Sequence, residues 1–172
     1  MTCPLGPLHA PLWRMLSIRY QHAPFSGEGA RLYGGRWNAK GVAALYAALD
    51  PVTAVAEYYQ GFPRPGTLAP YRIEAVAIAD LTDGHGHPRD AAIAAALAAP
   101  WKAIAAIDGA APSSWTLAAT LIDAGADGAL VPSAQNSGAT ALVLWRWHGA
   151  EAAGEGARLA LLDPEGSLTS VR

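Results

Sequence analysis

Apolar and polar positions alternate along several short stretches of the chain, and this alternation is typical of half-buried β-strands. The predicted strands are Leu12–Arg19, Arg31–Asn38, Val42–Ala47, Tyr71–Leu81, Ala129–Val131, Ala141–Trp147 and Arg158–Leu162. In the stretch 141–147, Val143, Trp145 and Trp147 fall on one predicted face. A polar, glycine-rich loop over Phe25–Ala30 precedes the second strand.

Three stretches carry the signals that begin and end helices. The predicted helices run from Asp50 to Gly61, from Asp90 through Ala98, and from Ser113 or Ser114 to Gly125. Asp50 supplies an N-cap oxygen, and Pro51 suits the first helical position. Because strands and helices mix without a regular βαβ rhythm, the sequence predicts an α+β fold in a single domain that spans residues 1–172.

Composition narrows the classes of function. Of the 172 residues, 52% are hydrophobic and only 15% are charged, which indicates a folded chain with a sparsely charged surface. The net charge of −2 leaves no basic stripe, so direct binding to nucleic acid is not expected. The single cysteine, Cys3, excludes an intrachain disulfide, and the longest apolar run is too short to span a bilayer. We therefore expect a cytoplasmic protein that does not bind membranes.

The stretch Arg31–Asn38 carries the most informative chemistry. Its glycine pair, Gly34 and Gly35, predicts a bulge or a close approach to the backbone, because adjacent glycines weaken a strand. Arg36 can bind a phosphate through its planar fork, and an ordinary surface arginine is the simpler alternative. Asn38 is either part of the same site or a turn residue.

Three other residues, which lie later in the chain, can serve the same site. Glu57 borders the apolar stripe of its predicted helix, where a carboxylate can stabilise an oxocarbenium-like transition state; the alternative is a solvated glutamate. Tyr46 can stack on a flat ring or pack in the core. Ser133 can donate a hydrogen bond to a ligand or occupy a turn after Pro132.

These residues resemble a known family. The segments Gly34-Gly35-Arg36-Trp37-Asn38, Tyr46, Glu57 and Val131-Pro132-Ser133 are similar to those of the RES domain, which is named for its arginine, glutamate and serine. The toxin halves of Xre–RES toxin–antitoxin systems carry this domain. The resemblance covers about residues 13–147, and it is greatest to the members that ADP-ribosylate phosphoribosyl-pyrophosphate synthetase.

The resemblance implies an ADP-ribosyltransferase-like fold, in which a split antiparallel sheet with flanking helices holds NAD in a cleft. NAD would be a co-substrate whose nicotinamide–ribose bond is broken, with no metal involved. Glu57 would be the catalytic carboxylate, assisted by Arg36 and Tyr46. The residues expected to bind NAD are Arg31, Gly35, Arg36, Asn38, Tyr46 and Ser133. Many members have an asparagine soon after the Pro-Ser pair. The positions near that pair in this chain are Gln135, Asn136 and Thr140, and the resemblance does not assign the role to one of them.

The resemblance also implies a bacterial toxin that transfers ADP-ribose to a protein, with phosphoribosyl-pyrophosphate synthetase as the candidate acceptor. The alternative is a glycohydrolase or phosphorylase that passes ADP-ribose to water or phosphate and so depletes NAD. A cognate Xre-like antitoxin is expected to cover the NAD cleft. Such an antitoxin would carry the DNA-binding element of the pair.

Two other classes of function are disfavoured. A binding module that has lost activity does not need the retained Arg36, Tyr46 and Glu57. An RNA-cleaving toxin would need more basic character and a histidine-based acid–base pair. The segment Asp83–His87 offers two histidines without a third ligand at a fixed spacing, so we predict no metal site there.

Overall fold

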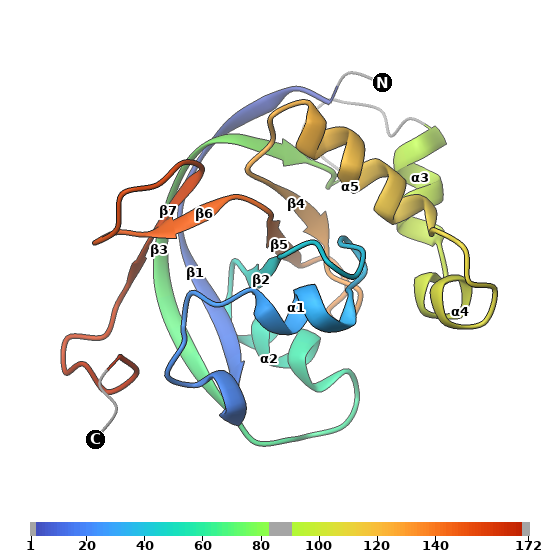
Figure 1. Cartoon of the computed structure of the whole chain (residues 1–172). Helices are drawn as coiled ribbons and strands as arrows, with labels where there is room; N and C mark the ends of the chain where they lie inside the picture. Colours follow the sequence, from blue (N-terminus) through green and yellow to red (C-terminus); the bar gives the residue numbers. More distant parts are fainter. Residues whose placement is uncertain (1–2, 83–90, 170–172) are drawn as a thin grey trace.

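The computed structural model, which describes residues 3–82 and 91–169, folds the chain around a curved sheet (Figure 1). Within these residues the strands are β1 (Leu5–Ser17), β2 (Leu45–Ala48), β3 (Gly66–Asp80), β4 (Gly128–Pro132), β5 (Thr140–Leu144), β6 (Trp147–Gly149) and β7 (Ala157–Leu161). The helices are α1 (Glu28–Tyr33), α2 (Pro51–Tyr59), α3 (Ala91–Ala98), α4 (Trp101–Ala106) and α5 (Ser113–Asp123), with a 3-10 turn over Ile18–Tyr20. The predicted α+β class is confirmed.

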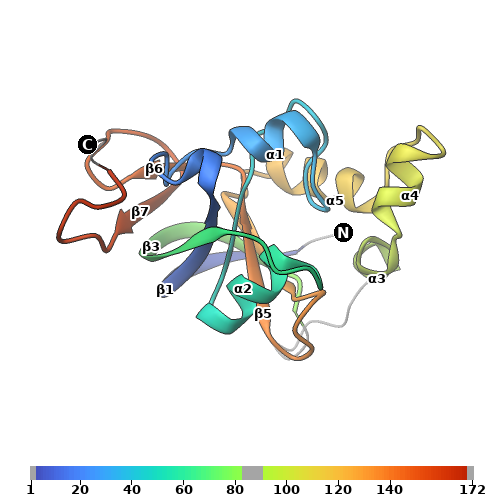
Figure 2. The same cartoon turned by 90° about the horizontal axis from the view of Figure 1, so that it is seen from below.

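The sheet closes on itself. Its strand order is β1-β2-β5-β4-β3-β7-β6, and β1 also pairs with β3, so five strands form a ring to which β7 and β6 are added. The β1–β3 pairing is antiparallel and extends from Leu5 opposite Ala79 to Ser17 opposite Gly66. Most pairings are antiparallel, as expected, whereas β3–β4 and β6–β7 are parallel. The long β1–β3 pair lies on the side opposite α3, α4 and α5 (Figures 1 and 2).

The core has two layers because the central strands are buried on both faces. In β5, Leu142 and Leu144 join the cluster inside the ring of strands, while Val143 joins a second cluster under α3 and α5. The side chains that α3 and α5 bury in this second cluster are Ile93, Ala96, Leu117, Ala118 and Leu121. The helix α2 packs on the other side, against β1 and β2 (Figure 2).

The prediction of a strand over Arg31–Asn38 was wrong. Residues 28–33 form α1, and the chain then turns through a tight loop, residues 34–38, which is closed by a backbone bridge between Gly35 and Asn38. Gly34 ends the helix with a φ of 72°, a conformation that favours glycine. The strand predicted from Val42 begins at residue 45, and part of the loop predicted over residues 25–30 belongs to α1.

The strand predicted over residues 141–147 is interrupted after Leu144. The backbone N–H groups of Trp145 and Arg146 both donate to the carbonyl of Asp127, at 2.8 and 3.1 Å, and the chain bends there before β6 begins. As a result, Val143 and Trp145 share the cluster under the helices, whereas Trp147 packs against the cluster inside the ring. The expectation that all three lie on one face was therefore wrong.

The predicted helices are present with different ends. Asp50 caps α2 as expected, because its Oδ1 accepts from the Thr53 N–H at 2.8 Å. The helix α5 begins at Ser113 without a side-chain cap, and the Ser113 hydroxyl donates to the carbonyl of Ala95 instead. The helix α4 was not predicted. The expected cap at residue 90 and the segment 83–87 lie outside the described residues.

Among the helices that the structure describes, none combines the length and the apolar character that crossing a membrane requires.

The pairing of β4 with β5 depends on a glycine. A Cβ added at Gly128 would lie 2.2 Å from the carbonyl oxygen of Val143 and 3.0 Å from the Cα of Leu144, so the backbone would have to move. We expect Gly128→Ala to lower the free energy of unfolding by about 2–3 kcal/mol, measured by denaturant titration. The control Gly6→Ala has open space around its Cβ and should change stability by less than about 0.5 kcal/mol. Equal stability of the two variants would contradict this account of the β4–β5 contact.

Candidate active site

The loop 34–38 is held against β2 by Tyr46. The Tyr46 hydroxyl accepts from the Trp37 N–H at 2.9 Å and donates to Oδ1 of Asn38 at 2.7 Å. A Cβ on Gly35 would lie 2.5 Å from that hydroxyl, so the close approach predicted at the glycine pair is made by Tyr46. Burial raises the pKa of Tyr46, which keeps its hydroxyl a neutral donor. The loop therefore depends on the Tyr46 hydroxyl for its hydrogen bonds, and that hydroxyl fits only because residue 35 is a glycine.

Asn38 is the second support of the loop. Its side chain is buried, with 1% of its surface exposed, and its amide donates to the carbonyls of Ala30, Ala39 and Val42 at 2.9–3.2 Å. An extended strand does not bring three carbonyls around one side-chain amide, which is why the tight loop forms here. The amide of Asn38 thereby fixes the end of α1 relative to the loop.

Two indole groups hold the backbone on either side of Arg36. The Nε1 of Trp115, on α5, donates to the carbonyl of Gly35 at 2.8 Å, and the Nε1 of Trp145 donates to the carbonyl of Trp37 at 2.9 Å. Buried carbonyls need such partners, because an unmade hydrogen bond in the interior costs about 1–3 kcal/mol. The backbone position of Arg36 is thus set before any ligand binds.

The guanidinium of Arg36 has unused hydrogen-bonding capacity. Its Nη2 donates to the carbonyl of Leu97, near the end of α3, at 2.6 Å, whereas its buried Nε has no partner among the described residues. Leaving a guanidinium N–H buried and unpaired is unfavourable, and an anion would relieve this. Arg36 therefore has the chemistry of an anion-binding group.

Glu57 is held by the turn that follows β4. Its Oε1 accepts from the Ser133 hydroxyl at 2.5 Å, from the Ala134 N–H at 2.8 Å and from the Gln135 N–H at 3.2 Å. The Ser133 oxygen in turn accepts from the N–H groups of Gln135 and Asn136 at 3.2 and 3.0 Å. Within the described part of the chain, Oε2 of Glu57 accepts no hydrogen bond. One carboxylate oxygen is therefore fixed, and the other is available to a ligand.

A carboxylate fixed in this way can stabilise positive charge without first having to reorganise. Electrostatic stabilisation of a transition state is strongest where the charged group is already in place. A carboxylate beside a sugar carbon performs this role in glycoside cleavage. The contact between Glu57 and Ser133 was not predicted, although both residues were predicted to belong to the site.

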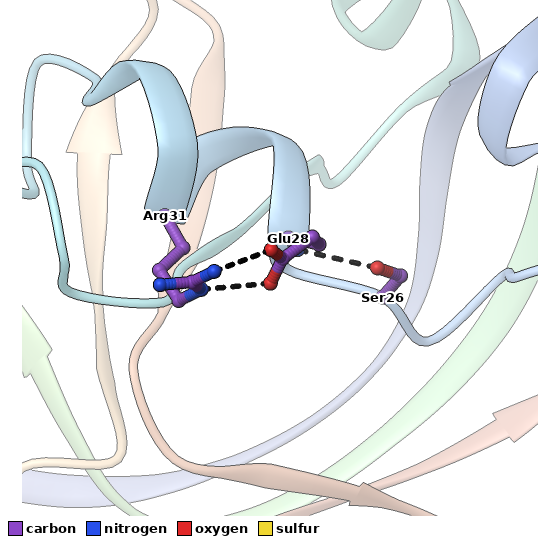
Figure 3. Close-up of polar contacts among 3 residues, drawn as sticks. All are labelled: Ser26, Glu28 and Arg31. Carbon is purple, nitrogen blue, oxygen red and sulfur yellow. Dashed lines mark hydrogen bonds and ion pairs between the residues drawn. The ribbon is translucent and has the colours of Figure 1, made fainter.

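Arg31 is paired with a carboxylate of its own helix (Figure 3). It lies in the last turn of α1, and its Nε and Nη2 both donate to the carboxylate of Glu28, at 2.8 and 2.5 Å. This pair is exposed to solvent, and the charged hydrogen bond lowers the pKa of Glu28. The edge of the guanidinium that carries Nε and Nη2 is occupied by Glu28.

The segment that leads into α1 is anchored by three side chains. Arg14 donates to the carbonyls of Pro24 and Ser26 at 3.0 and 2.7 Å, and the Tyr71 hydroxyl also donates to Pro24 at 2.7 Å. The Trp147 indole donates to the carbonyl of Phe25 at 2.9 Å. Desolvation lowers the pKa of the buried Arg14 guanidinium. These contacts fix the start of α1, and hence the loop after it, relative to β1 and β3.

Thr53 and Asn136 also contact the site; Thr53 was not assigned to it from the sequence, and Asn136 was named only as one of the positions near the Pro-Ser pair. The Asn136 amide donates to the hydroxyl of Thr53 at 2.8 Å, and Thr53 lies four residues before Glu57 on α2. That spacing, which places two residues on one helix face, is the signal by which Thr53 could have been found. No cluster of His, Cys, Asp and Glu suited to a metal ion occurs among the described residues.

Sequence comparison finds relatives among curated proteins. Two curated relatives are named "Toxin Res": one from Yersinia enterocolitica is 36% identical over 69 residues, and one from Photorhabdus laumondii is 44% identical over 46 residues. These matches cover 40% and 27% of this chain, and they span 45% and 30% of the relatives' own lengths.

A solved structure shares the fold. The crystal structure of the M. tuberculosis MbcT–MbcA toxin–antitoxin complex aligns with a TM-score of 0.54 and 21% identity, over 81% of this chain and 75% of the solved one. At this identity the likeness concerns the fold alone. The model of the RES domain matches residues 11–167, which include every site residue described above. The chain belongs to the RES domain family.

Proposed function

We propose that this chain is a toxin of a bacterial toxin–antitoxin system that breaks the nicotinamide–ribose bond of NAD and transfers ADP-ribose to a protein. The relatives named as toxins and the fold shared with a toxin–antitoxin complex support the class. The observation that carries the proposal is the carboxylate of Glu57, with one oxygen held by three donors and the other left over.

In this proposal Arg36 binds the phosphates of NAD, since its Nε is buried without a partner among the described residues. Glu57 stabilises the positive charge that develops on the ribose as the bond to nicotinamide breaks. The bonding electron pair leaves on the nicotinamide nitrogen, which was cationic and becomes neutral, so no strong acid is needed. The acceptor nucleophile then bonds to the anomeric carbon and releases its proton to solvent.

The supporting residues act through these two. The Tyr46 hydroxyl and the Asn38 amide are used within the loop, so we assign Tyr46 and Asn38 to holding Arg36 in place, with the ring of Tyr46 as the part that faces nicotinamide or ribose. Gly35 is required for the approach of Tyr46. Ser133 orients Glu57. We place Arg31 at the edge of the site, where binding a phosphate through Nε and Nη2 would require the release of Glu28.

The partners proposed for this chain are a cognate antitoxin and a protein acceptor. Its likeness in fold to a chain of a toxin–antitoxin complex supports the antitoxin. We propose that an Xre-like antitoxin covers the NAD site and that phosphoribosyl-pyrophosphate synthetase is the candidate acceptor. We propose a cytoplasmic setting, where NAD is available.

The first test removes the charge of Glu57. Glu57→Gln retains the shape and an oxygen acceptor for the Ser133 turn, so the fold should persist. We expect kcat for nicotinamide release to fall about a hundredfold to a thousandfold, which corresponds to about 3–4 kcal/mol. The matched control is Glu74→Gln, which removes an exposed glutamate on β3 paired with Arg158 and should leave kcat unchanged. Near-wild-type release by folded Glu57→Gln protein would remove this residue from the mechanism.

The second test concerns phosphate binding. An ammonium group cannot reproduce the planar fork of a guanidinium, so Arg36→Lys should weaken NAD binding by about 1.5–3 kcal/mol, roughly tenfold to a hundredfold in Kd. Calorimetric titration with NAD measures this directly. Arg72→Lys, at an exposed position of β3, is the control and should bind NAD as the wild type does. Equal affinity of the Arg36→Lys and wild-type proteins would exclude a phosphate role for Arg36.

The third test separates transfer from depletion. We propose transfer to a protein, while a glycohydrolase or phosphorylase would use the same Glu57 to pass ADP-ribose to water or phosphate. Incubation of the purified protein with cell extract and NAD labelled in its adenylate part should produce a labelled protein band that Glu57→Gln protein does not produce. Label found only in free ADP-ribose or its phosphate would favour NAD depletion instead.

A further inference from the structure

A chain of hydrogen bonds joins the start of α2 to the carboxylate of Glu57. Asp50 accepts from the Thr53 hydroxyl at 2.6 Å, and the Thr53 oxygen accepts from the Asn136 amide at 2.8 Å. The Asn136 N–H donates to the Ser133 hydroxyl at 3.0 Å, and that hydroxyl donates to Glu57 at 2.5 Å. The network therefore begins and ends on a carboxylate of the same helical segment.

The direction of each hydrogen bond in this network is determined by its two ends. An ionised carboxylate only accepts, so the single proton of the Thr53 hydroxyl goes to Asp50, and the single proton of the Ser133 hydroxyl goes to Glu57. Each hydroxyl oxygen can then accept a hydrogen bond from Asn136: the Thr53 oxygen from the side-chain amide, and the Ser133 oxygen from the backbone N–H. Hydrogen bonds from the Thr53 side chain and backbone lower the pKa of Asp50, which keeps that end ionised.

Thr53 and Glu57 grip the turn after β4 at two points. They are four residues apart on α2 and so share one face of the helix. The turn spans residues 133–139; Glu57 holds its beginning at Ser133, and Thr53 holds its middle at Asn136. Backbone hydrogen bonds from Ser133 to Ala139 and from Ala139 to Asn136 close the turn itself. The contact at Thr53 gives the turn a second attachment to α2, which fixes its orientation relative to that helix. Thr53 is fully buried, so water does not replace the second attachment.

We infer that Thr53 and Asn136 are positioning residues for Glu57. Together they orient the turn whose donors hold Oε1, and so they determine where Oε2 is presented to the substrate. This inference rests on the proposed function, because it assigns the two residues to the same NAD-cleaving site. It adds residues that touch neither the substrate nor the reacting atoms.

The test compares Thr53→Val with Thr53→Ser. Valine matches the shape of threonine but has no hydroxyl, so the Asn136 amide loses its acceptor, while serine keeps the hydroxyl. Misplacement of a catalytic group by about 1 Å can cost roughly a hundredfold in rate, so we expect Thr53→Val to lower kcat for nicotinamide release about tenfold to a hundredfold with little change in KM. Thr53→Ser, which keeps the hydroxyl, should retain the wild-type kcat. Thr120→Val, which removes an exposed hydroxyl on α5, is the matched control and should leave kcat unchanged.

A second variant and a second measurement make the test independent of folding and of activity. Asn136→Ala breaks the same contact and leaves the Asp50–Thr53 cap intact. In the wild type, the amide-proton resonances of Ala134 and Gln135 should shift as the Glu57 carboxylate protonates, because both N–H groups bind it. This titration should disappear in Glu57→Gln and shrink in Thr53→Val and Asn136→Ala.

The inference requires both changes. In Thr53→Val or Asn136→Ala, a lower kcat with an unchanged amide titration would overturn the inference, as would a smaller titration with wild-type kcat. If Thr53→Ser recovers neither kcat nor the titration, the effect of Thr53→Val is due to packing, and the inference is overturned. If the wild-type protein cleaves no NAD, the proposed function fails separately. The amide titration would then still decide whether Thr53 and Asn136 position Glu57.

Discussion

The loop 34–38 is half-buried, with Trp37 and Asn38 in the interior, and its buried polar groups must find partners there. Side chains from three directions meet this requirement: Tyr46 on β2, Trp115 on α5 and Trp145 at the end of β5. Asn38 does the same from within the loop. Since each of these groups belongs to a different element, the loop takes its form only when the sheet and the helices have already assembled around it. The position of Arg36 is therefore determined by the assembled sheet and helices.

The two chemical groups of the site are supported by different parts of the fold. Arg36 stands on a loop held by indole and phenol groups, and Glu57 stands on a helix joined to the turn after β4. The strands β2, β5 and β4 are neighbours in the sheet, so the elements that hold the two groups share one rigid frame. Sites built on such frames keep their geometry better than sites on free loops. Under the proposed function, this preorganisation favours electrostatic catalysis, in which little movement accompanies the reaction.

Local signals were sufficient for some of these features and insufficient for others. The helix α2 was predictable because its cap, Asp50, and the position of Glu57 beside the apolar stripe are properties of a few adjacent residues. The segment 31–38 was predicted as a strand because its form depends on Tyr46 and on distant indole donors, which leave no local pattern. The bend after Leu144 was missed for the same reason, since it is caused by the carbonyl of Asp127. Family resemblance made Ser133 a candidate site residue, but its contact with Glu57 joins positions 76 residues apart and could be seen only in the fold.

That separation has a consequence for how the molecule is made. Translation proceeds from the N-terminus, so a nascent chain contains Arg36 and Glu57 long before the turn that holds the carboxylate has been synthesised. Until β4 and β5 emerge, the ring of strands is also open, because these two strands connect β2 to β3. A chain interrupted before this point has the residues of the site but not the site itself. Under the proposed function, truncated products of an aborted translation would not cleave NAD, and an antitoxin would have to bind only completed molecules.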